Sequence, residues 1–526
     1  MLNLGSLLGT TARDHPEKTA VIFGADRQNY RQLNEAANRV AGGLKGLGVL
    51  PGQTVALMCP NVPEFLASYY GILKAGAVVV PISPLSKARE VAYHLEDSGA
   101  VALLAYESFA GEARAGFQQV ESCWQMVIIA ARPSTSAAET YPGSLTLEHL
   151  TLDRPGEFDC VQTASGDTAV ILYTSGTTGK AKGAELSHSN LVLNALVSRD
   201  MLGATSEDVI LFAAPAFHST GQSLVMNNAV LTGAAVSMIM RWDPRAALDR
   251  IVRDRVSLLV GAPTMYWSLL NGLAQSGLDP KTVRASLRLA ACGGASMPAE
   301  VSRGVEEKLG IPMLEGYGLS EATATVCINH RHRPRKLGSI GTPVWGVEMC
   351  CVDANDRPVP AGIPGEILIR GHNVMNGYHR RREDTSRVLR GGWLHTGDVG
   401  RTDEDGYFYV VDRLADVINR AGYNVYPREV EDVLMGHPAV SLVAVIGVPV
   451  EGIGEEVMAV AQLKSGMQVS EDELMAFGKA NLAAYKYPRI VKLVPALPLT
   501  ASGKVHKSVL RADIRQGLIP PKQDKP

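Results

Sequence analysis

Short apolar runs alternate with amphipathic helical stretches along most of this chain, and this alternation restricts the fold more than any other feature. Leu33, Ala37, Val40 and Leu44 recur at helical spacing on one face of an expected helix. Apolar runs of strand length, most of them flanked by glycine or proline, occur at residues 55–58, 77–80, 101–105, 169–173, 257–260 and 287–291. Buried strands separated by helices are typical of α/β layers, so we expect a large body of mixed α/β structure.

A second, smaller domain is predicted near the C-terminal end. After about Asp412, a glycine turn, a helix over residues 427–435 and two strands follow in close succession. The length of 526 residues also exceeds what one hydrophobic core usually organises. We therefore expect a large N-terminal domain over residues 1–413 and a smaller, mobile α+β domain over residues 414–526.

Composition excludes several classes of protein. With 46% apolar and 20% charged residues, the chain can bury enough surface to fold. Its 51 Lys and Arg balance 53 Asp and Glu, so the formal charge of −2 gives no field that would attract nucleic acid or an anionic membrane. There is no signal-peptide pattern, no apolar run of the roughly 20 residues that span a bilayer, and no CxxC pair among the cysteines. We expect a cytoplasmic protein with no transmembrane segment and no nucleic-acid partner.

The segment YTSGTTGKAKG at residues 173–183 points to phosphate chemistry. An apolar strand runs directly into it, and its glycines let backbone N–H groups approach an anion closely. Further donors and positive charge would come from Thr174, Ser175, Thr177, Thr178, Lys180 and Lys182. The spacing does not match the P-loop pattern GxxxxGK[ST], because Thr174 stands where the first glycine would be. A plain surface turn is the alternative, and the buried strand directly before the loop favours a nucleotide contact over it.

This segment resembles the phosphate loop of the adenylate-forming superfamily, which comprises acyl-CoA synthetases, luciferases and peptide-synthetase adenylation domains. Further blocks resemble motifs of that superfamily and occur in its order. They are PAFHSTG at 215–221, GAPTMY at 261–266, CGGASMP at 292–298, EGYGLSE at 315–321, GEILIRG at 365–371, WLHTGDVG at 393–400, VDRLADVINRAGYNVYPREVE at 411–431 and LPLTASGK at 497–504. The blocks GHNVMNGY at 371–378 and GYNVYPRE at 422–429 are most similar to those of fatty-acyl-CoA synthetases.

The resemblance implies an ATP and AMP site to which several of these blocks contribute. Glu321 would bind Mg²⁺ at the nucleotide phosphates, because a carboxylate supplies the hard oxygen ligand that Mg²⁺ prefers. Tyr317 would lie against adenine, and Asp398 with Arg413 would bind the ribose hydroxyls. The other expected ATP or AMP contacts are Thr174, Ser175, Gly176, Thr177, Thr178, Gly179, Lys182, Gly294, Ala295, Ser296, Glu315, Gly316 and Gly318.

The resemblance also implies a catalytic set of Lys504, Glu321, Ser320 and His218. A mobile Lys504 ammonium would neutralise charge as the acyl oxygen attacks the α-phosphate and pyrophosphate leaves. Ser320 keeps the hydroxyl of the threonine that is usual in the family. His218 corresponds to a position that borders the acyl pocket and the thiol entrance, so we expect it to contact substrate rather than to act as a general base. The other expected acyl or CoA contacts are Gly293, Val225, Gly422 and Tyr423.

Two positions depart from the family pattern. Ala181 replaces a frequent proline between the two lysines, which should loosen the phosphate loop without removing a donor. Ala415 lies at the expected hinge, two residues after Arg413, where the family commonly carries lysine or aspartate. Alanine keeps the backbone pivot at this hinge but removes a polar side chain, which puts the efficiency of domain rotation in question.

The sequence therefore predicts a two-domain acyl-CoA synthetase that uses ATP, Mg²⁺ and coenzyme A. The N-terminal domain would hold the ATP and acyl sites, and the C-terminal lid domain would carry the catalytic lysine. The low aromatic content, with the apolar Val225 and Met226, favours a medium- or long-chain fatty acid as the substrate. An aryl acid, malonate, an amine acceptor and a degenerate adenylate-binding sensor are the alternatives. The basic run at 330–336 could dock CoA phosphates or form a plain solvated loop. The sequence leaves the oligomeric state open, with a homodimer among the options.

Overall fold

The computed structural model describes residues 2–130, 141–174, 180–295, 297–421, 423–450, 454–499 and 505–519. The chain forms two compact units, each of mixed α/β structure, and the larger unit is the N-terminal one. The first unit contains residues 1–349 and 369–394, and the second contains residues 350–368 and 395–526. The expected fold class is thereby confirmed. The domain boundary after residue 413 stays a prediction, because compactness shows which residues pack together and not where a mobile domain turns.

A nine-stranded sheet organises much of the first unit. In spatial order its strands are β16 (Thr342–Pro343), β15 (Cys327–Ile328), β14 (Met313–Tyr317), β13 (Leu289–Cys292), β12 (Leu258–Gly261), β10 (Val209–Phe212), β11 (Ala235–Met238), β1 (Thr19–Phe23) and β2 (Asp26–Asn29). The strands from β14 to β1 in this order are parallel to their neighbours. Their carboxyl ends therefore lie at one edge of the sheet, which is where open α/β sheets hold their ligands.

An eight-stranded sheet forms the rest of the framework of this unit. In spatial order its strands are β19 (Gly377–Tyr378), β9 (Lys182–Ser187), β8 (Thr168–Thr174), β4 (Val78–Pro81), β3 (Thr54–Met58), β5 (Ala102–Tyr106), β6 (Gln125–Ile129) and β7 (Leu145–Thr146). Strands β8 and β9 pair antiparallel, with Thr174 opposite Lys182. The two ends of the expected phosphate loop are therefore fixed to adjacent strands.

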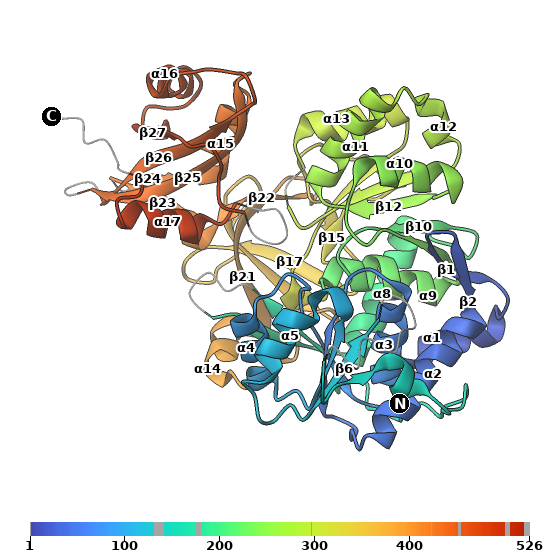
Figure 1. Ribbon diagram of the computed structural model, residues 1–526. Helices are drawn as coiled ribbons and strands as arrows, with labels where there is room; N and C mark the ends of the chain where they lie inside the picture. The colour runs from blue at the N-terminus through green and yellow to red at the C-terminus, as the bar shows by residue number, and fades with distance from the viewer. Residues whose placement is uncertain are drawn as a thin grey trace. The chain divides into compact units, whose positions relative to one another are not determined.

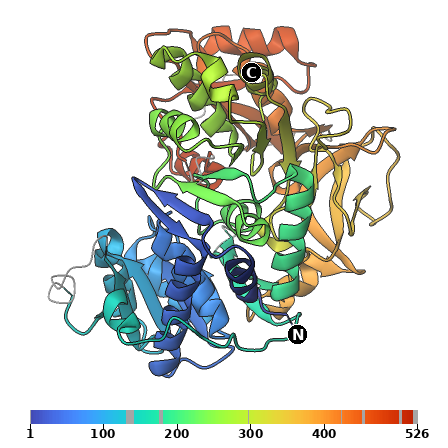
Figure 2. The ribbon, with the colours of Figure 1, turned by 90° about the vertical axis from the view of Figure 1, so that its right-hand side faces the viewer.

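Helices cover both sheets, and the helix predicted around Leu33 begins where the sequence provides a cap. The Asn29 side chain accepts a hydrogen bond from the Gln32 N–H, and the Gln32 side chain accepts one from the Asn29 N–H, which is a capping box. Figure 1 labels the elements, and Figure 2 shows the blue helices near the N-terminus from a second side. The helices of this unit are α1 (Ser6–Asp14), α2 (Tyr30–Gly46), α3 (Pro63–Lys74), α4 (Ala88–Ser98), α5 (Ala110–Phe117), α7 (Leu147–Thr151), α8 (His188–Leu202), α9 (Asn228–Thr232), α10 (Pro244–Arg253), α11 (Pro263–Ser276), α12 (Pro280–Arg284), α13 (Ala299–Leu309) and α14 (Arg382–Val388).

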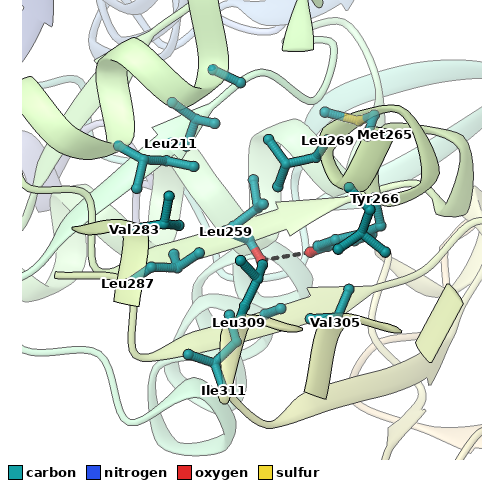
Figure 3. Close-up of a cluster of buried hydrophobic side chains, with 14 of the residues drawn as sticks. Leu211, Leu259, Met265, Tyr266, Leu269, Val283, Leu287, Val305, Leu309 and Ile311 are labelled. Atoms are coloured by element: carbon teal, nitrogen blue, oxygen red, sulfur yellow. Dashed lines mark hydrogen bonds between the residues drawn. The ribbon is translucent and has the colours of Figure 1, made fainter. Parts of the chain in front are cut away.

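One hydrophobic core lies between the nine-stranded sheet and helices α10 to α13. Leu211, Leu259, Leu269 and Val305 are among its fully buried members (Figure 3). The Tyr266 hydroxyl lies in this core and donates to the Leu259 carbonyl oxygen at 2.8 Å. A buried hydroxyl needs such a partner, so the tyrosine of the GAPTMY block ties its helix to the sheet.

The second unit is smaller and contains a sheet of its own. In spatial order the strands of this sheet are β24 (Tyr423–Val425), β23 (Ile418–Arg420), β26 (Gly454–Leu463) and β25 (Val440–Val450), with β27 (Ile490–Leu493) also paired to β26. Its helices are α15 (Pro427–Met435), α16 (Glu471–Asn481) and α17 (Lys507–Arg515). The strands near the boundary between the units are β17 (Val347–Val352), β18 (Gly365–Gly371), β20 (Leu389–Arg390), β21 (Trp393–Thr402) and β22 (Phe408–Arg413). Among the described residues, no helix is both long and apolar enough to cross a membrane.

Candidate active site

Four of the motif blocks meet at the carboxyl edge of the nine-stranded sheet. The PAFHSTG block follows β10, the GAPTMY block begins at the end of β12, the CGGASMP block begins at the end of β13, and the EGYGLSE block begins within β14. Because these strands are parallel and adjacent, blocks separated by up to about a hundred residues in sequence are brought to one edge. The parallel pairing of β10, β12, β13 and β14 assembles this site.

A chain of polar contacts links the expected Mg²⁺ ligand to a lysine of the phosphate loop. The Tyr378 hydroxyl donates to the Glu321 carboxylate at 2.9 Å, and the Lys182 ammonium lies 5.3 Å from the centre of the Tyr378 ring. Lys182 also forms a 2.8 Å ion pair with Asp384, in which both side chains are about one-quarter exposed. Burial, and then the charge of Glu321, raise the pKa of Tyr378, so its hydroxyl stays protonated and can donate. One tyrosine thus contacts a carboxylate through its hydroxyl and an ammonium through its ring.

The turn that carries Glu321 depends on a close backbone approach. A Cβ atom added at Gly318 would lie 1.2 Å from the Ala324 carbonyl oxygen, so only glycine fits there. Ser320 and Glu321 lie in the short helix η3 (Ser320–Ala322), and Thr323 follows with a positive φ of 53°. The Thr323 hydroxyl donates to the Asn373 carbonyl oxygen at 2.7 Å, which ties the end of the turn to the GHNVMNGY block.

The other predicted nucleotide contacts of this unit lie at the ends of β8, β13 and β14. Tyr317 is half-buried at the end of β14, next to Gly316. Glu315 is buried, and its carboxylate accepts the Met297 N–H at 3.1 Å, so it also braces the CGGASMP block. Gly294 and Ala295 are exposed after β13, and the Thr174 hydroxyl donates to the Lys182 carbonyl oxygen at 3.5 Å.

The expected acyl-site residues are placed very differently from one another. His218 is exposed, and its Nδ1 accepts the Thr220 N–H at 3.4 Å. Val225 is fully buried in the π-helix η2 (Gly221–Asn227), a rare form that is frequent at functional sites. Gly293 is half-buried after β13, and a Cβ atom added there would lie 3.6 Å from the Gly316 carbonyl oxygen. Small residues therefore line the space between the ends of β13 and β14.

In the second unit, the expected ribose pair is formed across two strands. Asp398 on β21 lies opposite Arg413 on β22, and the Arg413 Nε atom is 3.3 Å from the Asp398 carboxylate. The Asp398 N–H donates to the Thr396 hydroxyl at 3.0 Å, and the Gly397 N–H donates to Glu366 at 3.0 Å. The Asp398 side chain is only 11% exposed, whereas the Arg413 side chain is 55% exposed, so the carboxylate is enclosed and the arginine faces solvent.

The expected hinge is braced on both sides by carboxylates. Ala415 lies in the short helix η4 (Leu414–Asp416). Before it, Asp412 accepts the N–H groups of Arg413 and Arg428, both at 2.7 Å. After it, Asp416 forms a 2.6 Å ion pair with Arg511.

Several predicted residues lie outside the described part of the chain. They are Ser175, Gly176, Thr177, Thr178, Gly179, Ser296, Gly422 and Lys504. Their roles stay predictions. Tyr423 is described, is 59% exposed and has its ring centre 4.9 Å from that of Tyr485.

The sequence did not single out the residues that hold the two lysines of the phosphate loop. Tyr378 and Asp384 lie beside Lys182, while Tyr93 of helix α4 lies beside Lys180. Tyr378 ends the GHNVMNGY block, so its position in a motif was the available signal. The spacing of Tyr93 and Asp97 by four residues places them on one helix face, but no sequence pattern relates that face to the loop.

Comparison with known proteins agrees with this arrangement. The family described as "AMP-binding enzyme" matches residues 8–379, and "AMP-binding enzyme C-terminal domain" matches residues 429–504. A feruloyl-CoA synthase from Amycolatopsis sp is 37% identical over 97% of this chain and 98% of that protein. A long-chain-fatty-acid–CoA ligase from Bacillus subtilis is 33% identical over 95% of this chain and 93% of that protein. The crystal structure of ATP-bound MatB from Rhodopseudomonas palustris superimposes with a TM-score of 0.90 at 31% identity, over 98% of this chain and 99% of that one.

The fold and the matches define an ATP-dependent, adenylate-forming ligase. The chain belongs to the AMP-binding enzyme family, and within it to the AMP-forming acyl- and aryl-CoA ligases. The resemblance inferred from the motif blocks is thereby confirmed, as is the enzyme class.

Proposed function

We propose that this protein uses ATP with Mg²⁺ to activate an apolar monocarboxylic acid as its acyl-adenylate, and then transfers the acyl group to coenzyme A. The contact chain from Glu321 through Tyr378 to Lys182 is the observation that carries the proposal. It holds one carboxylate and one ammonium beside the strand ends where the motif blocks converge. Such a pair suits a metal-bound polyphosphate, because the carboxylate can hold Mg²⁺ while the ammonium contacts the phosphate oxygens directly.

The donor chemistry at Glu321 fits Mg²⁺. The carboxylate is half-buried, and the Tyr378 hydroxyl orients it by donating to Oε1. Glu321 would hold the ion, and when bound the ion would supply positive charge at the nucleotide phosphates. Ser320, the residue before Glu321, adds a hydroxyl to the same turn.

The reaction needs two displacements at two different atoms. In the first, an oxygen of the acid's carboxylate forms a bond to the α-phosphorus of ATP, and the bond to pyrophosphate breaks. In the second, the sulfur of coenzyme A forms a bond to the acyl carbon as the thiol loses its proton to solvent, and AMP departs with the bonding electron pair. Lys504 would neutralise the charge of the first displacement, and Asp398 with Arg413 would hold the ribose.

A medium- or long-chain fatty acid remains the first candidate for the substrate. The fully buried Val225 and Met226 on the π-helix support an apolar acyl site, as does the similarity to a long-chain-fatty-acid–CoA ligase. A substituted aryl acid is the second candidate, because the similarity to a feruloyl-CoA synthase, at 37% identity, extends over nearly the whole chain.

An acid panel tests the proposal. Purified protein is incubated with ATP, Mg²⁺ and coenzyme A together with dodecanoate, ferulate, benzoate or malonate, and AMP and thioester are measured by chromatography. We expect AMP and thioester in equal amounts with dodecanoate. If the two products form with ferulate and not with dodecanoate, the substrate is the aryl candidate. AMP without thioester would overturn the transfer to coenzyme A, and the absence of AMP with every acid would overturn the activation step.

A further inference from the structure

Helix α4 contacts the chain on both sides of the phosphate loop through two side chains on one face. Tyr93 and Asp97 are four residues apart, which places them one above the other on the helix. Asp97 accepts a 2.9 Å hydrogen bond from the Tyr173 hydroxyl near the end of β8. Asp97 also pairs with Arg381 at 2.6 Å. The strand before the loop is therefore fixed to the helix at Tyr173.

Tyr93 makes the corresponding contact on the other side of the loop. Its hydroxyl donates to the Ala181 carbonyl oxygen at 2.5 Å. The Lys180 ammonium lies 5.5 Å from the centre of the Tyr93 ring, within the range of a cation–π interaction. One tyrosine thus contacts both the backbone and the side chain of the segment that contains the two lysines.

The Tyr93 hydrogen bond falls on a residue whose own side chain does not restrain the backbone. Ala181 stands between Lys180 and Lys182. Proline would fix the backbone φ angle of this segment, and alanine does not. A hydrogen bond to the carbonyl group of the same residue restricts the same peptide unit by other means.

We propose that Tyr93 is a positioning residue for the nucleotide phosphates, which fixes the Ala181 peptide so that Lys180 and Lys182 keep their places beside the phosphate loop. This inference rests on the proposed use of ATP. The Tyr93 hydroxyl can serve as a donor throughout the neutral range, because burial and then the charge of Asp97 raise its pKa. The Lys182 side chain is held separately by Asp384, so Tyr93 acts on the backbone of the segment and not on both lysine side chains.

Two substitutions and their combination test the proposal. Tyr93→Phe keeps the ring beside Lys180 and removes only the hydroxyl, while Ala181→Pro supplies the alternative restraint. KM for ATP, KM for the acid and the thermal midpoint are measured for the wild type, both single variants and the double variant by acid-dependent ATP–pyrophosphate exchange. Tyr409→Phe is the matched control, because Tyr409 is also half-buried and its hydroxyl donates to Asp403 at 3.0 Å in the second unit.

We expect Tyr93→Phe to raise KM for ATP about two- to tenfold, the size expected for one lost hydrogen bond, and to leave KM for the acid unchanged. Ala181→Pro in the Tyr93→Phe background should return KM for ATP to within about twofold of the wild-type value. If the wild type is active and Tyr93→Phe leaves KM for ATP unchanged, the role proposed for Tyr93 is overturned and the proposed function stands. Equal changes in both KM values, or no rescue by proline, also overturn it, because Tyr93 would then have only a general structural role. No exchange by the wild type with any acid overturns the proposed function, and this inference with it.

Discussion

Removal of the Tyr378 hydroxyl tests the part of the site that is expected to hold Mg²⁺. In Tyr378→Phe, the ring remains below the Lys182 ammonium, so the 5.3 Å cation–π contact is kept and only the 2.9 Å hydrogen bond to Glu321 is lost. A hydrogen bond to a charged group contributes about 1.5–3 kcal/mol, which corresponds to roughly a ten- to hundredfold change in affinity. Loss of a partner that orients a metal ligand typically costs a similar factor.

The assay is the initial rate of acid-dependent ATP–pyrophosphate exchange while Mg²⁺ is titrated at fixed ATP. We expect the Mg²⁺ concentration for half-maximal rate to rise about tenfold or more in Tyr378→Phe, with KM for the acid unchanged. Tyr409→Phe again serves as the control for loss of a half-buried tyrosine hydroxyl. An unchanged Mg²⁺ dependence in an active Tyr378→Phe variant would refute the inference that the Tyr378 hydroxyl orients Glu321 as the metal ligand.

Three further predictions address the lysine, the glycine turn and a buried histidine. Lys504→Ala should abolish adenylate formation from acid and ATP but spare thioester synthesis from supplied acyl-adenylate, and equal loss of both activities would remove its assigned role. Gly318→Ala should lower the free energy of unfolding by more than about 3 kcal/mol in urea denaturation, because its Cβ atom would lie 1.2 Å from the Ala324 carbonyl oxygen. Gly293→Ala should be nearly neutral for stability, because the nearest atom to its Cβ would be 3.6 Å away. Equal effects of the two substitutions would contradict this prediction. His188 is buried, its Nδ1 accepts the Leu4 N–H, and burial lowers its pKa to about 4. Below about pH 6.5 the His188 side chain takes up a proton in the unfolded chain but stays neutral in the native state. The free energy of unfolding therefore has its full value above that pH and falls by about 3 kcal/mol toward pH 4. His188→Asn keeps an acceptor and should lose less stability between pH 7 and pH 4.5 than the wild type, while an identical loss would contradict the argument.

Local patterns in the sequence predicted individual elements well. Helix α15 occupies residues 427–435 as expected, because Pro427 starts the helix and Val430 and Leu434 supply its buried face. Strand β8 covers the apolar run that leads into the phosphate loop. The motif blocks were predicted from resemblance, and the parallel strands bring four of these blocks to one edge.

Contacts between distant segments could not be predicted in the same way. Tyr378 and Glu321 are 57 residues apart, and Tyr93 and Ala181 are 88 residues apart. Their pairing depends on which strands become neighbours, and that order is not visible in local periodicity. The π-helix that contains Val225 is likewise absent from the pattern, because apolar spacing distinguishes helices from strands and not one helical hydrogen-bond register from another.

Isotope exchange tests the central claim most directly. Radiolabelled pyrophosphate is supplied with ATP, Mg²⁺ and the preferred acid in the absence of coenzyme A, and label is measured in ATP. Reversible attack of a carboxylate on the α-phosphorus predicts that label enters ATP only when the acid and Mg²⁺ are both present. Label entering ATP at the same rate without acid, or cleavage of ATP to ADP and phosphate instead, would contradict the account.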